Sequence, residues 1–435
     1  MKRPADGLTS RIEAREALVG VVGLGYVGLP SAVAFAEAGF RVVGIDLDRE
    51  RVRAIREGRS YLLDVPSDRM SALVRAKKLR AGSSYRQLAD ADAVLISVPT
   101  PITDGAPDLS SVVASGRSLS AVLRPGTLVV LESTTYPGTT EELLKPILEA
   151  RGLIAGRDFL LAYSPERIDP GNPTHGFSDI PRIVGGMGRK ATQAAAALYE
   201  KVVPKVVTVS GPREAELAKL IENTFRHVNI ALVNELAVYA HEMDVSIWEA
   251  IGAAATKPFG FMPFWPGPGW GGHCIPLDPA YLSWRVRREH AHEIRFVELA
   301  HAINAEMPRH VMGRATQLLN ERRKSVRGSR ILGVGAGYKG RTDDTRGSPG
   351  IRILGWLAQQ GAVVAYHDPL VAEAEIGGRR LRSVELTERE LRKADLVVVF
   401  VPQADVDWAM IARAAPVVLD CCNVVPKGSA KLERL

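Results

Sequence analysis

The stretch Val19-Gly20-Val21-Val22-Gly23-Leu24-Gly25-Tyr26-Val27-Gly28 decides the fold of this 435-residue chain. It places the pattern Gly-x-Gly-x-x-Gly directly after a β-branched apolar run and before a helical pattern. In that context the glycines form a tight turn and seat a pyrophosphate on the N-terminus of the helix. The stretch therefore predicts a dinucleotide-binding loop. Its expected cofactor contacts are Gly23, Gly25, Tyr26, Val27 and Gly28.

A carboxylate follows this loop at the end of the next strand candidate. Asp46 stands 18 residues after Gly28, where a carboxylate accepts hydrogen bonds from ribose hydroxyls and repels a 2′-phosphate. We therefore expect NAD rather than NADP as the cofactor. Arg51 lies nearby in the sequence and could instead meet a 2′-phosphate or stack on the adenine. The alternative for the glycine turn is that it only packs a helix onto a sheet, without a ligand.

Short β-branched runs alternate with helical stretches over the first half of the chain, which predicts a parallel sheet wrapped by helices. The strand candidates there are Leu18–Val22, Arg41–Ile45, Ala93–Val98, Leu128–Leu131, Phe159–Tyr163 and Val206–Val209. From about Pro212 the pattern is continuously helical, with Pro212 in the first turn. A second and smaller sheet is predicted from the strand candidates Arg330–Val334, Ala362–His367, Leu396–Val401 and Pro416–Asp420.

We therefore expect an α/β chain in which two Rossmann-like parallel-sheet domains are bridged by a helical segment. The predicted divisions are an N-terminal tail (1–15), an NAD-binding domain (16–211), a helical central domain (212–320) and a second α/β domain (321–435). A long helical bridge must bury its apolar face, so we expect the central domain to pack against its own copy in a homodimer.

Composition narrows the range of partners and compartments. The formal charge of +7 suits anionic small ligands, but the 56 Lys and Arg residues are dispersed, so no nucleic-acid partner is expected. The three cysteines cannot form a disulfide framework and the polar start lacks an apolar signal core, which indicates a cytoplasmic protein. The uncharged run 19–36 contains four glycines and Pro30, so we read it as strand, turn and helix and expect no membrane association.

Three polar segments each follow a strand candidate of the first sheet: Ser97–Pro101, Glu132–Gly138 and Tyr163–Pro170. Loops after parallel strands gather at the carboxyl edge of the sheet, where ligands bind, so these segments should surround the nicotinamide. Pro99, Thr100 and Thr134 are the expected contacts, and Glu166 offers a base. Each Ser or Thr here could equally be a turn cap.

A lone cysteine lies in the glycine-rich stretch Gly267–Pro279, beside the carboxylate of Asp278. Glycines allow close approach of a ligand, and a thiol held near positive charge ionises and becomes a nucleophile. Cys274 is therefore a candidate nucleophile, with a buried and inert cysteine as the alternative reading. No metal site is expected, because the chain has no Cys-x-x-Cys or His-x-x-His partner.

Taken together, these segments resemble the nucleotide-sugar 6-dehydrogenases, a family that includes UDP-glucose and GDP-mannose dehydrogenases. The resemblance extends over nearly the whole chain after the first ~15 residues. It is carried by the glycine-rich loop and by Ser97–Pro101, Glu132–Thr140, Ser164–Asn172, Lys219–Asn234, Gly267–Pro279 and Asp343–Pro349. Within the family, Ser164–Asn172 and Lys257–Phe261 look most like the UDP-N-acetylglucosamine 6-dehydrogenases.

The resemblance implies a four-electron oxidation of the sugar C6 alcohol to a carboxylate, with two NAD molecules consumed in turn. A water held near Lys219 and Asp278 takes the hydroxyl proton, and the Cys274 thiolate attacks the resulting aldehyde. The thiohemiacetal then gives a thioester, which water activated by Glu166 hydrolyses. Lys219 and Asn223 are four residues apart on a predicted helix, so both can face the developing oxyanion. Thr134 completes the implied catalytic set.

The resemblance also implies a UDP-sugar substrate. Arg167, Arg226 and His227 are candidates to contact the N-acetyl group, and Lys339 and Arg346 are candidates to contact the nucleotide phosphates in the last domain. Glu166, Lys219, Asn223, Phe261 and Gly271 are the further expected substrate contacts. Gly347 departs from the family pattern, which commonly has glutamate after the arginine, and Cys422 stands where a basic residue normally helps to grip the nucleotide.

Other functions are compatible with parts of this pattern. A different hydroxyacid dehydrogenase would share the first sheet but have no use for Cys274, and a protein that only senses NAD would have no use for any catalytic group. The same chemistry could act on UDP-N-acetylmannosamine, UDP-N-acetylgalactosamine or UDP-glucose. The residues alone leave open the sugar epimer, the pathway (surface polysaccharide or secondary metabolite) and any oligomer beyond the dimer.

Overall fold

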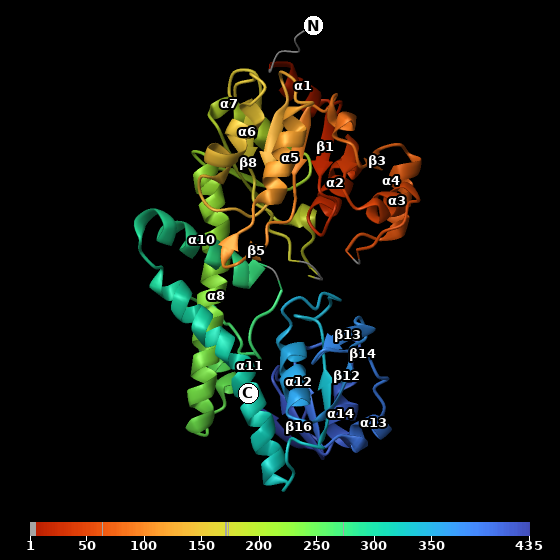
Figure 1. The fold of residues 1–435 in the computed structure, drawn as a ribbon, viewed down its shortest axis with the longest axis vertical. Coiled ribbons are helices and arrows are strands. Elements are labelled where there is room, and N and C mark those ends of the chain that lie inside the picture. Colours follow the sequence, from red (N-terminus) through yellow and green to blue (C-terminus); the bar gives the residue numbers. More distant parts are fainter. Residues whose placement is uncertain (1–5, 63, 170–171, 173, 273) are drawn as a thin grey trace. The chain divides into compact units, whose positions relative to one another are not determined.

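The computed structural model describes residues 6–62, 64–169, 172, 174–272 and 274–435 (Figure 1). The chain forms two compact units, Met1–Glu222 and Asn223–Leu435, and the division falls within a long helix, α8 (Pro212–Glu242). None of the described helices combines the length and the apolar character that crossing a membrane would require.

The first unit is built on a sheet with the strand order β10-β9-β8-β7-β4-β1-β2-β3. Its strands are β1 (Leu18–Val22), β2 (Arg41–Ile45), β3 (Leu79–Gly82), β4 (Ala93–Ile96), β7 (Leu128–Leu131), β8 (Leu160–Tyr163), β9 (Arg182–Gly186) and β10 (Val206–Thr208). β1, β4 and β7 are buried along their whole length, as their unbroken apolar sequences predict. A separate two-stranded ribbon, β5 (Ile102–Thr103) and β6 (Ala106–Pro107), follows β4.

Helices connect these strands. They are α1 (Asp6–Glu13), α2 (Gly28–Glu37), α3 (Arg49–Arg56), α4 (Ser67–Arg75), α5 (Ser110–Ser120), α6 (Lys145–Glu149) and α7 (Arg189–Tyr199). Short helical turns are η1 (Tyr85–Leu88), η2 (Thr139–Leu144, a π-helix) and η3 (Phe177–Asp179). Figure 1 shows α2 and α5 alongside the sheet, and the apolar residues of α2 and α7 belong to its core.

The six predicted strands of this unit are confirmed to within two residues at their ends, but the prediction missed β3 and β9 of the sheet and the short ribbon of β5 and β6. Both are weak sequence signals, because β3 is a short edge strand containing Arg80 and β9 ends in two glycines. The expected sheet was wholly parallel. In the structure β9 runs antiparallel to β8, with Ala162 opposite Gly186, so one pair of the otherwise parallel sheet is reversed.

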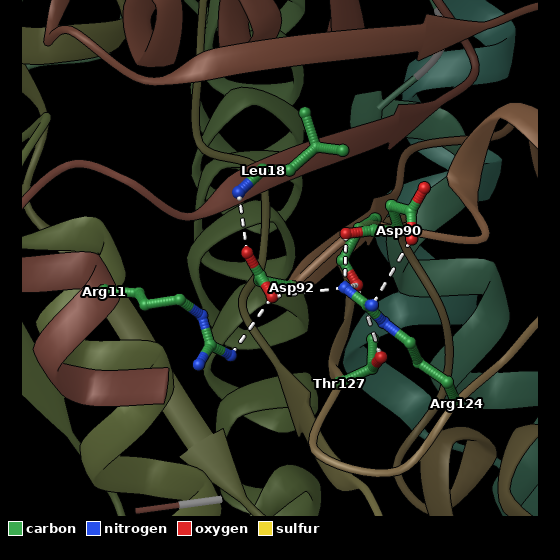
Figure 2. A network of polar contacts seen from close by, with 7 residues as sticks. Arg11, Leu18, Asp90, Asp92, Arg124 and Thr127 are labelled. Atoms are coloured by element: carbon green, nitrogen blue, oxygen red, sulfur yellow. Dashed lines mark hydrogen bonds and ion pairs between the residues drawn. The ribbon is translucent and has the colours of Figure 1, made fainter. Parts of the chain in front are cut away.

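Residues 1–15 were predicted to be a tail, and this prediction is wrong for the described part. Helix α1 buries Leu8 and Ile12 completely in the core of the unit. Figure 2 shows the polar anchor of this helix. The buried carboxylate of Asp92 accepts a hydrogen bond from the Leu18 N–H at 3.0 Å and pairs with Arg11 of α1 at 3.1 Å and with Arg124 at 3.3 Å. The apolar pattern of α1 is too short to be recognised in the sequence.

The second unit begins with helices, as predicted. After the second half of α8 come α9 (Ile247–Ala254), α10 (Cys274–His290) and α11 (Arg295–Glu321). The helical pattern is not continuous, however, because residues 255–272 form an irregular segment with four prolines that cannot donate backbone hydrogen bonds. Asn304 of α11 ties this helix to α8, since its side chain accepts from Asn234 at 2.8 Å and donates to the His227 carbonyl at 3.3 Å.

The second sheet has the order β12-β11-β15-β16-β17 and is parallel throughout. Its strands are β11 (Arg330–Val334), β12 (Val363–His367), β15 (Leu396–Val399), β16 (Val417–Asp420) and β17 (Lys431–Arg434), beside the hairpin β13 (Glu373–Ile376) and β14 (Arg379–Arg382). Its helices are α12 (Pro349–Gln359), α13 (Glu388–Lys393) and α14 (Trp408–Ala414). The four predicted strands are confirmed; β17 and the charged hairpin were missed.

The last half of α11 belongs to the core of this second sheet. Met307, Val311 and Leu318 of α11 pack in one apolar cluster with Ile353 and Leu354 of α12 and with β11, β15 and β16. The division predicted at residue 320 therefore separates a helix from the sheet on which it packs. A smaller cluster joins α8 to α9, and Trp248 of α9 donates to the Leu435 carbonyl at 3.1 Å.

Candidate active site

The glycine-rich loop between β1 and α2 has the geometry that only glycine permits. Gly23 adopts φ 87°, and a Cβ on it would lie 2.4 Å from the Ser97 carbonyl oxygen. A Cβ on Gly28 would lie 1.8 Å from the Gly23 carbonyl oxygen. By contrast, the nearest atom to a Cβ on Gly25 is an Arg51 guanidinium nitrogen at 3.7 Å. Two glycines thus close the turn, while the third keeps backbone open to a ligand.

The N-terminus of α2 fits a pyrophosphate. Its N-cap residue, Val27, provides no side-chain hydrogen bond to the first N–H groups of the helix. Such N–H groups together with the helix dipole make an anion site. Gly23, Gly25, Tyr26, Val27 and Gly28 surround this N-terminus, as expected from the sequence, and the Tyr26 side chain is 40% exposed.

Asp46 follows β2 directly and holds the loop. Its carboxylate accepts hydrogen bonds from the Leu24 N–H and from the Asp48 N–H, both at 2.8 Å. Arg51 lies 3.5 Å from the same carboxylate and 3.5 Å from Asp48, and its guanidinium stacks over Tyr61. A carboxylate has about four lone-pair positions, so Asp46 retains capacity for ribose hydroxyls. Arg51 is engaged by two carboxylates, which disfavours its use for a 2′-phosphate.

The loops after β4 and β7 lie together at the carboxyl edge of the sheet, as predicted. The Ser133 hydroxyl accepts from the Val98 N–H at 3.0 Å and donates to the Val98 carbonyl at 2.8 Å. The Thr100 hydroxyl donates to the Thr134 carbonyl at 2.9 Å. Thr100 is therefore buried in a structural contact, while Thr134 is half-buried and Pro99 is exposed at this edge.

Glu166 follows β8 and is held from both of its oxygens. One oxygen accepts from the N–H groups of Arg167 and Ile168, both at 2.6 Å, and the other pairs with Arg182 at 2.6 Å. Only 8% of the residue is exposed. These contacts fix the orientation of the carboxylate at the edge of the sheet.

Sequence reasoning missed the buried charges behind Glu166. Glu132, at the end of β7, is fully buried, accepts from the Tyr199 hydroxyl at 2.7 Å and lies 3.7 Å from Arg182. Desolvation raises the pKa of Glu132, although Arg182 opposes this effect. The available signal was a charged residue next to an apolar strand in each case: Glu132 after Leu128–Leu131 and Arg182 at the start of β9.

Glu216, in the first turns of α8, was also missed. Its carboxylate accepts from the Gly138 N–H at 2.6 Å and from the N–H and hydroxyl of Thr140 at 2.9 and 2.7 Å. Burial raises the pKa of Glu216 to about 7, against the effect of these hydrogen bonds. The contacts tie α8 to the loop that contains Thr134.

Farther along α8, Lys219, Asn223 and His227 are buried, with exposed fractions of 6%, 5% and 1%. Their spacing places them along one side of the helix. Arg226, predicted with His227 to contact the N-acetyl group, is exposed, since it is one position out of register with the spacing of four residues. Arg167 is engaged elsewhere, because its guanidinium pairs with Glu222 at 2.7 Å and donates to the Pro181 carbonyl at 2.7 Å.

In the second unit, Cys274 is the first residue of α10. Its side chain and the whole of His273 lie outside the described residues. Asp278, one helical turn later, is 2% exposed, and the Asn223 side-chain amide donates a hydrogen bond to its carboxylate. Two of the predicted catalytic residues are thus in direct contact: Asn223 of α8 and Asp278, which lies in the first turns of the helix that starts at Cys274.

The glycines before Cys274 pack against the loop after β11. A Cβ on Gly272 would lie 2.5 Å from the Tyr338 ring, and a Cβ on Gly271 would lie 2.8 Å from the Gly347 carbonyl oxygen. Gly347 has φ 64°, which favours glycine at the position where the family commonly has glutamate. The segment leading to Cys274 therefore adjoins the loop predicted to bind the nucleotide.

The charged side chains of that loop already make contacts within the protein. The Lys339 ammonium lies 5.9 Å from the centre of the Tyr338 ring. Arg346 pairs with Asp344 at 2.6 Å, although its side chain remains 57% exposed. Phe261 is 41% exposed. The roles of these residues toward a substrate stay predictions.

Comparison with known proteins matches this arrangement over most of the chain. Models of the UDP-glucose/GDP-mannose dehydrogenase family match with the NAD binding domain at residues 17–203, the central domain at 213–306 and the UDP binding domain at 332–427. The chain belongs to this family. It is therefore an NAD-dependent nucleotide-sugar dehydrogenase, and its UDP binding domain indicates a UDP-sugar substrate.

Relatives of known activity differ in the sugar. A UDP-N-acetyl-D-mannosamine dehydrogenase from Pyrococcus horikoshii is 33% identical over 94% of this chain and 96% of its own. A UDP-N-acetyl-D-glucosamine 6-dehydrogenase from Pseudomonas aeruginosa is 36% identical over 81% of this chain and 83% of its own. A solved structure of UDP-D-ManNAc dehydrogenase from Pyrococcus horikoshii superimposes with a TM-score of 0.87 at 32% identity, covering 96% of this chain and 98% of that chain. Identity at this level leaves the epimer unresolved.

Proposed function

We propose that this enzyme oxidises the C6 alcohol of a UDP-N-acetylhexosamine, most specifically UDP-N-acetylglucosamine, to the uronate through covalent intermediates on Cys274. The observation that carries the proposal is the buried contact between Asn223 and Asp278 beside the start of α10. A carboxylate and an amide that are both desolvated and joined can orient a reacting hydroxyl and an oxyanion. A structural surface pair would not need this burial.

Four of the proposed catalytic groups act on the first oxidation and on the capture of the aldehyde. A water near Lys219 and Asp278 takes the C6 hydroxyl proton as the hydride leaves. The Cys274 sulfur then forms a bond to the aldehyde carbon, and the oxyanion that develops accepts hydrogen bonds from Lys219 and Asn223. The first residue of a helix is a favourable position for a thiolate.

When bound, NAD accepts one hydride in each of the two oxidations. The second hydride leaves the thiohemiacetal carbon and a thioester results. Water oriented by Glu166 adds to the thioester carbon, the carbon–sulfur bond breaks, and Cys274 is released as the thiolate. Thr134 lies on the loop that Glu216 ties to α8, and it is assigned to the catalytic set at the carboxyl edge of the first sheet.

The proposed substrate contacts follow the division of the chain. Lys339 and Arg346 are assigned to the diphosphate, since guanidinium and ammonium groups bind phosphates. His227, Arg226 and Arg167 are assigned to the N-acetyl group; the engagement of Arg167 with Glu222 makes it the weakest of the three. Support for the N-acetyl group also comes from the two relatives, which are named for N-acetylated sugars of opposite configuration at C2.

A homodimer is part of the proposal. Leu232, Leu236, Tyr239 and Met243 are 51%, 46%, 53% and 66% exposed and follow one another at steps of four, three and four residues along α8. An apolar stripe of this kind on a long helix favours pairing with a second copy. A monomeric mass by light scattering at micromolar concentration would contradict it. The reaction is assigned to the cytoplasm, where NAD is available.

The test uses purified enzyme, NAD and four UDP-sugars: N-acetylglucosamine, N-acetylmannosamine, N-acetylgalactosamine and glucose. We expect two NADH per uronate, checked by absorbance and product mass, and a preference for UDP-N-acetylglucosamine over UDP-glucose of up to ~10⁴ in kcat/KM. Comparable efficiency on UDP-glucose would overturn the N-acetyl assignment. A preference for another epimer would correct the substrate and leave the mechanism standing.

A further inference from the structure

Two buried carboxyl groups, those of Glu166 and Glu132, share one buried guanidinium, that of Arg182. Arg182 is 2% exposed, lies 2.6 Å from Glu166 and 3.7 Å from Glu132, and also donates to the Pro165 carbonyl at 2.8 Å. The rings of Phe177 and Tyr199 pack against the guanidinium at 4.4 and 5.3 Å from their centres. Arg182 therefore cannot move to follow either carboxylate.

Glu132 is held as firmly as Arg182. Its two oxygens accept separate hydrogen bonds, one from the Tyr199 hydroxyl at 2.7 Å and the other from the Ser97 hydroxyl. Both oxygens of Glu132 are therefore engaged by neighbouring hydroxyl groups. Two carboxyl groups and one guanidinium are thus enclosed together, and burial makes their mutual interactions stronger than they would be in water.

Arg167, next to Glu166 in sequence, pairs with Glu222 of α8 at 2.7 Å, and Lys219 lies one turn before Glu222 on the same helix. Arg167 and Glu222 neutralise each other. The Glu166 carboxylate itself pairs with Arg182, which in turn lies 3.7 Å from Glu132.

We propose that Arg182 and Glu132 are positioning residues for the hydrolysis of the acyl-enzyme, with Arg182 orienting the Glu166 carboxylate and Glu132 holding Arg182 in place. Arg182 lies 2.6 Å from a Glu166 oxygen, and the Glu132 carboxyl group lies 3.7 Å from the same guanidinium. Because the guanidinium is fixed, the Glu166 carboxylate keeps one orientation toward the attacking water. The inference rests on the proposed role of Glu166 in thioester hydrolysis.

The step balances as follows in atoms and charge. One proton of the attacking water passes to Glu166 while the water oxygen bonds to the acyl carbon. The carbon–sulfur bond breaks, and its electron pair leaves with the Cys274 sulfur. Glu166 then returns its proton to solvent. Neither Arg182 nor Glu132 touches the reacting atoms.

The decisive variant is Glu132→Gln, which is nearly isosteric and removes the carboxyl group that lies against Arg182. We expect thioester hydrolysis to slow by about 3-fold or more, because Arg182 is then held less firmly beside Glu166. The rate is measured by rapid mixing of enzyme, NAD and UDP-N-acetylglucosamine, with NADH release followed separately from uronate release. The two hydride-transfer phases should keep their rates. An unchanged hydrolysis rate would overturn the inference.

Three further variants make the result interpretable. Arg182→Gln should slow hydrolysis at least ~10-fold and accumulate acyl-enzyme detectable by intact mass, whereas Arg182→Lys should restore part of the rate. Glu142→Gln removes a carboxylate that pairs with Arg213 near the surface and should leave the hydrolysis rate unchanged. If Glu132→Gln does not fold, as judged by thermal melting, the Arg182 pair decides: equal hydrolysis in both Arg182 variants would overturn the inference.

Glu166→Gln separates this inference from the proposed function. If that variant hydrolyses the thioester at the normal rate, Glu166 is not the base and the proposed function fails at this step. If it accumulates acyl-enzyme while Glu132→Gln keeps the wild-type hydrolysis rate, the proposed function stands and the role of Glu132 is wrong.

Discussion

The two sheets of this protein each place an aspartate directly after their second strand, and the two aspartates do different things. Asp46 follows β2 and accepts two backbone N–H groups, at 2.8 Å each. Asp368 follows β12 and accepts five donors: the N–H groups of Ala336, Gly337, Leu370 and Val371 and the side-chain amide of Gln403, at 2.7 to 3.2 Å. Both carboxylates fasten the loop after the first strand of their sheet.

The loops also match, since Gly23 after β1 and Gly335 after β11 adopt φ of 87° and 90°. The carboxylates differ in what they have left to offer. Asp46 keeps lone pairs for a ribose, whereas Asp368 is 3% exposed and fully engaged by the protein. The same local arrangement, a glycine loop after the first strand and an aspartate after the second, therefore suits a dinucleotide in one unit and leaves the aspartate a structural role in the other.

The largest expected effect separates cofactor binding in the first unit from covalent chemistry on Cys274 in the second. Cys274→Ala should lower uronate formation by on the order of 10⁴-fold or more, because no thiohemiacetal can form. Binding of NAD, measured by calorimetry, should not change. An alanine variant with wild-type turnover would exclude the covalent route.

Replacing the two aspartates should affect different properties, stability for Asp368 and NAD binding for Asp46. Asp368→Ala leaves buried donors without an acceptor and should lower the free energy of unfolding by about 3 kcal/mol, with NAD affinity unchanged. Asp46→Ala should weaken NAD binding about 10-fold or more and narrow the preference over NADP, with a smaller loss of stability. Denaturant unfolding and NAD titration of both variants test this. Equal effects of the two substitutions on NAD would contradict the structural role of Asp368.

The two units should also respond to pH with opposite signs. Burial, with a smaller contribution from His301, lowers the pKa of His227 to about 4. The unfolded chain therefore binds a proton on His227 near pH 6.5, whereas the folded second unit binds it only near pH 4. The free energy of unfolding consequently decreases by up to about 3 kcal/mol as the pH falls from about 6.5 to 4. His227→Gln should flatten this dependence. Urea unfolding of the two proteins from pH 4 to 8 gives the comparison.

In the first unit, Glu216 should act in the reverse direction. Its pKa of about 7 means that the folded state keeps a proton which the unfolded chain releases near pH 4.5. Stability is then lost as the pH rises through about 7. Glu216→Gln should remove this loss, so that the free energy of unfolding of the variant exceeds that of the wild type above pH 7. A wild type that gains stability over the variant as the pH rises would show that Glu216 is folded in its ionised form.

The smallest effect concerns Arg51. Arg51→Ala should weaken NAD binding by about 1 kcal/mol, because the guanidinium no longer stacks on the adenine. It should not abolish the preference for NAD over NADP, because Asp46 and Asp48 both engage the guanidinium in the wild type. Kd values for both cofactors check this. A selective loss of NADP binding would mean that the arginine serves a 2′-phosphate after all.

Much of the fold could be predicted because its signals are local. The loop from Gly23 to Gly28, the apolar strands and the helix start at Pro212 are each contained in a few consecutive residues, and each is found where the sequence indicates. The strands that were missed have polar residues or glycines in place of that signal. The shared face of Lys219 and Asn223 was predicted from their spacing of four residues, whereas the burial of both side chains was not. Of the two candidates one turn later, His227 is buried and Arg226 is exposed, because only His227 keeps that spacing.

The sequence by itself determined the dinucleotide loop, the carboxylate after β2 and the position of the lone cysteine in a glycine-rich segment. Only the tertiary structure decided which charges are enclosed together. Glu216 and Thr140 are 76 residues apart, and Glu166 meets Arg182 only because β9 reverses beside β8. Nor does the sequence separate Asp46 from Asp368, since each simply follows an apolar strand. Ion pairing and burial depend on distances between remote segments, and no local pattern encodes those distances.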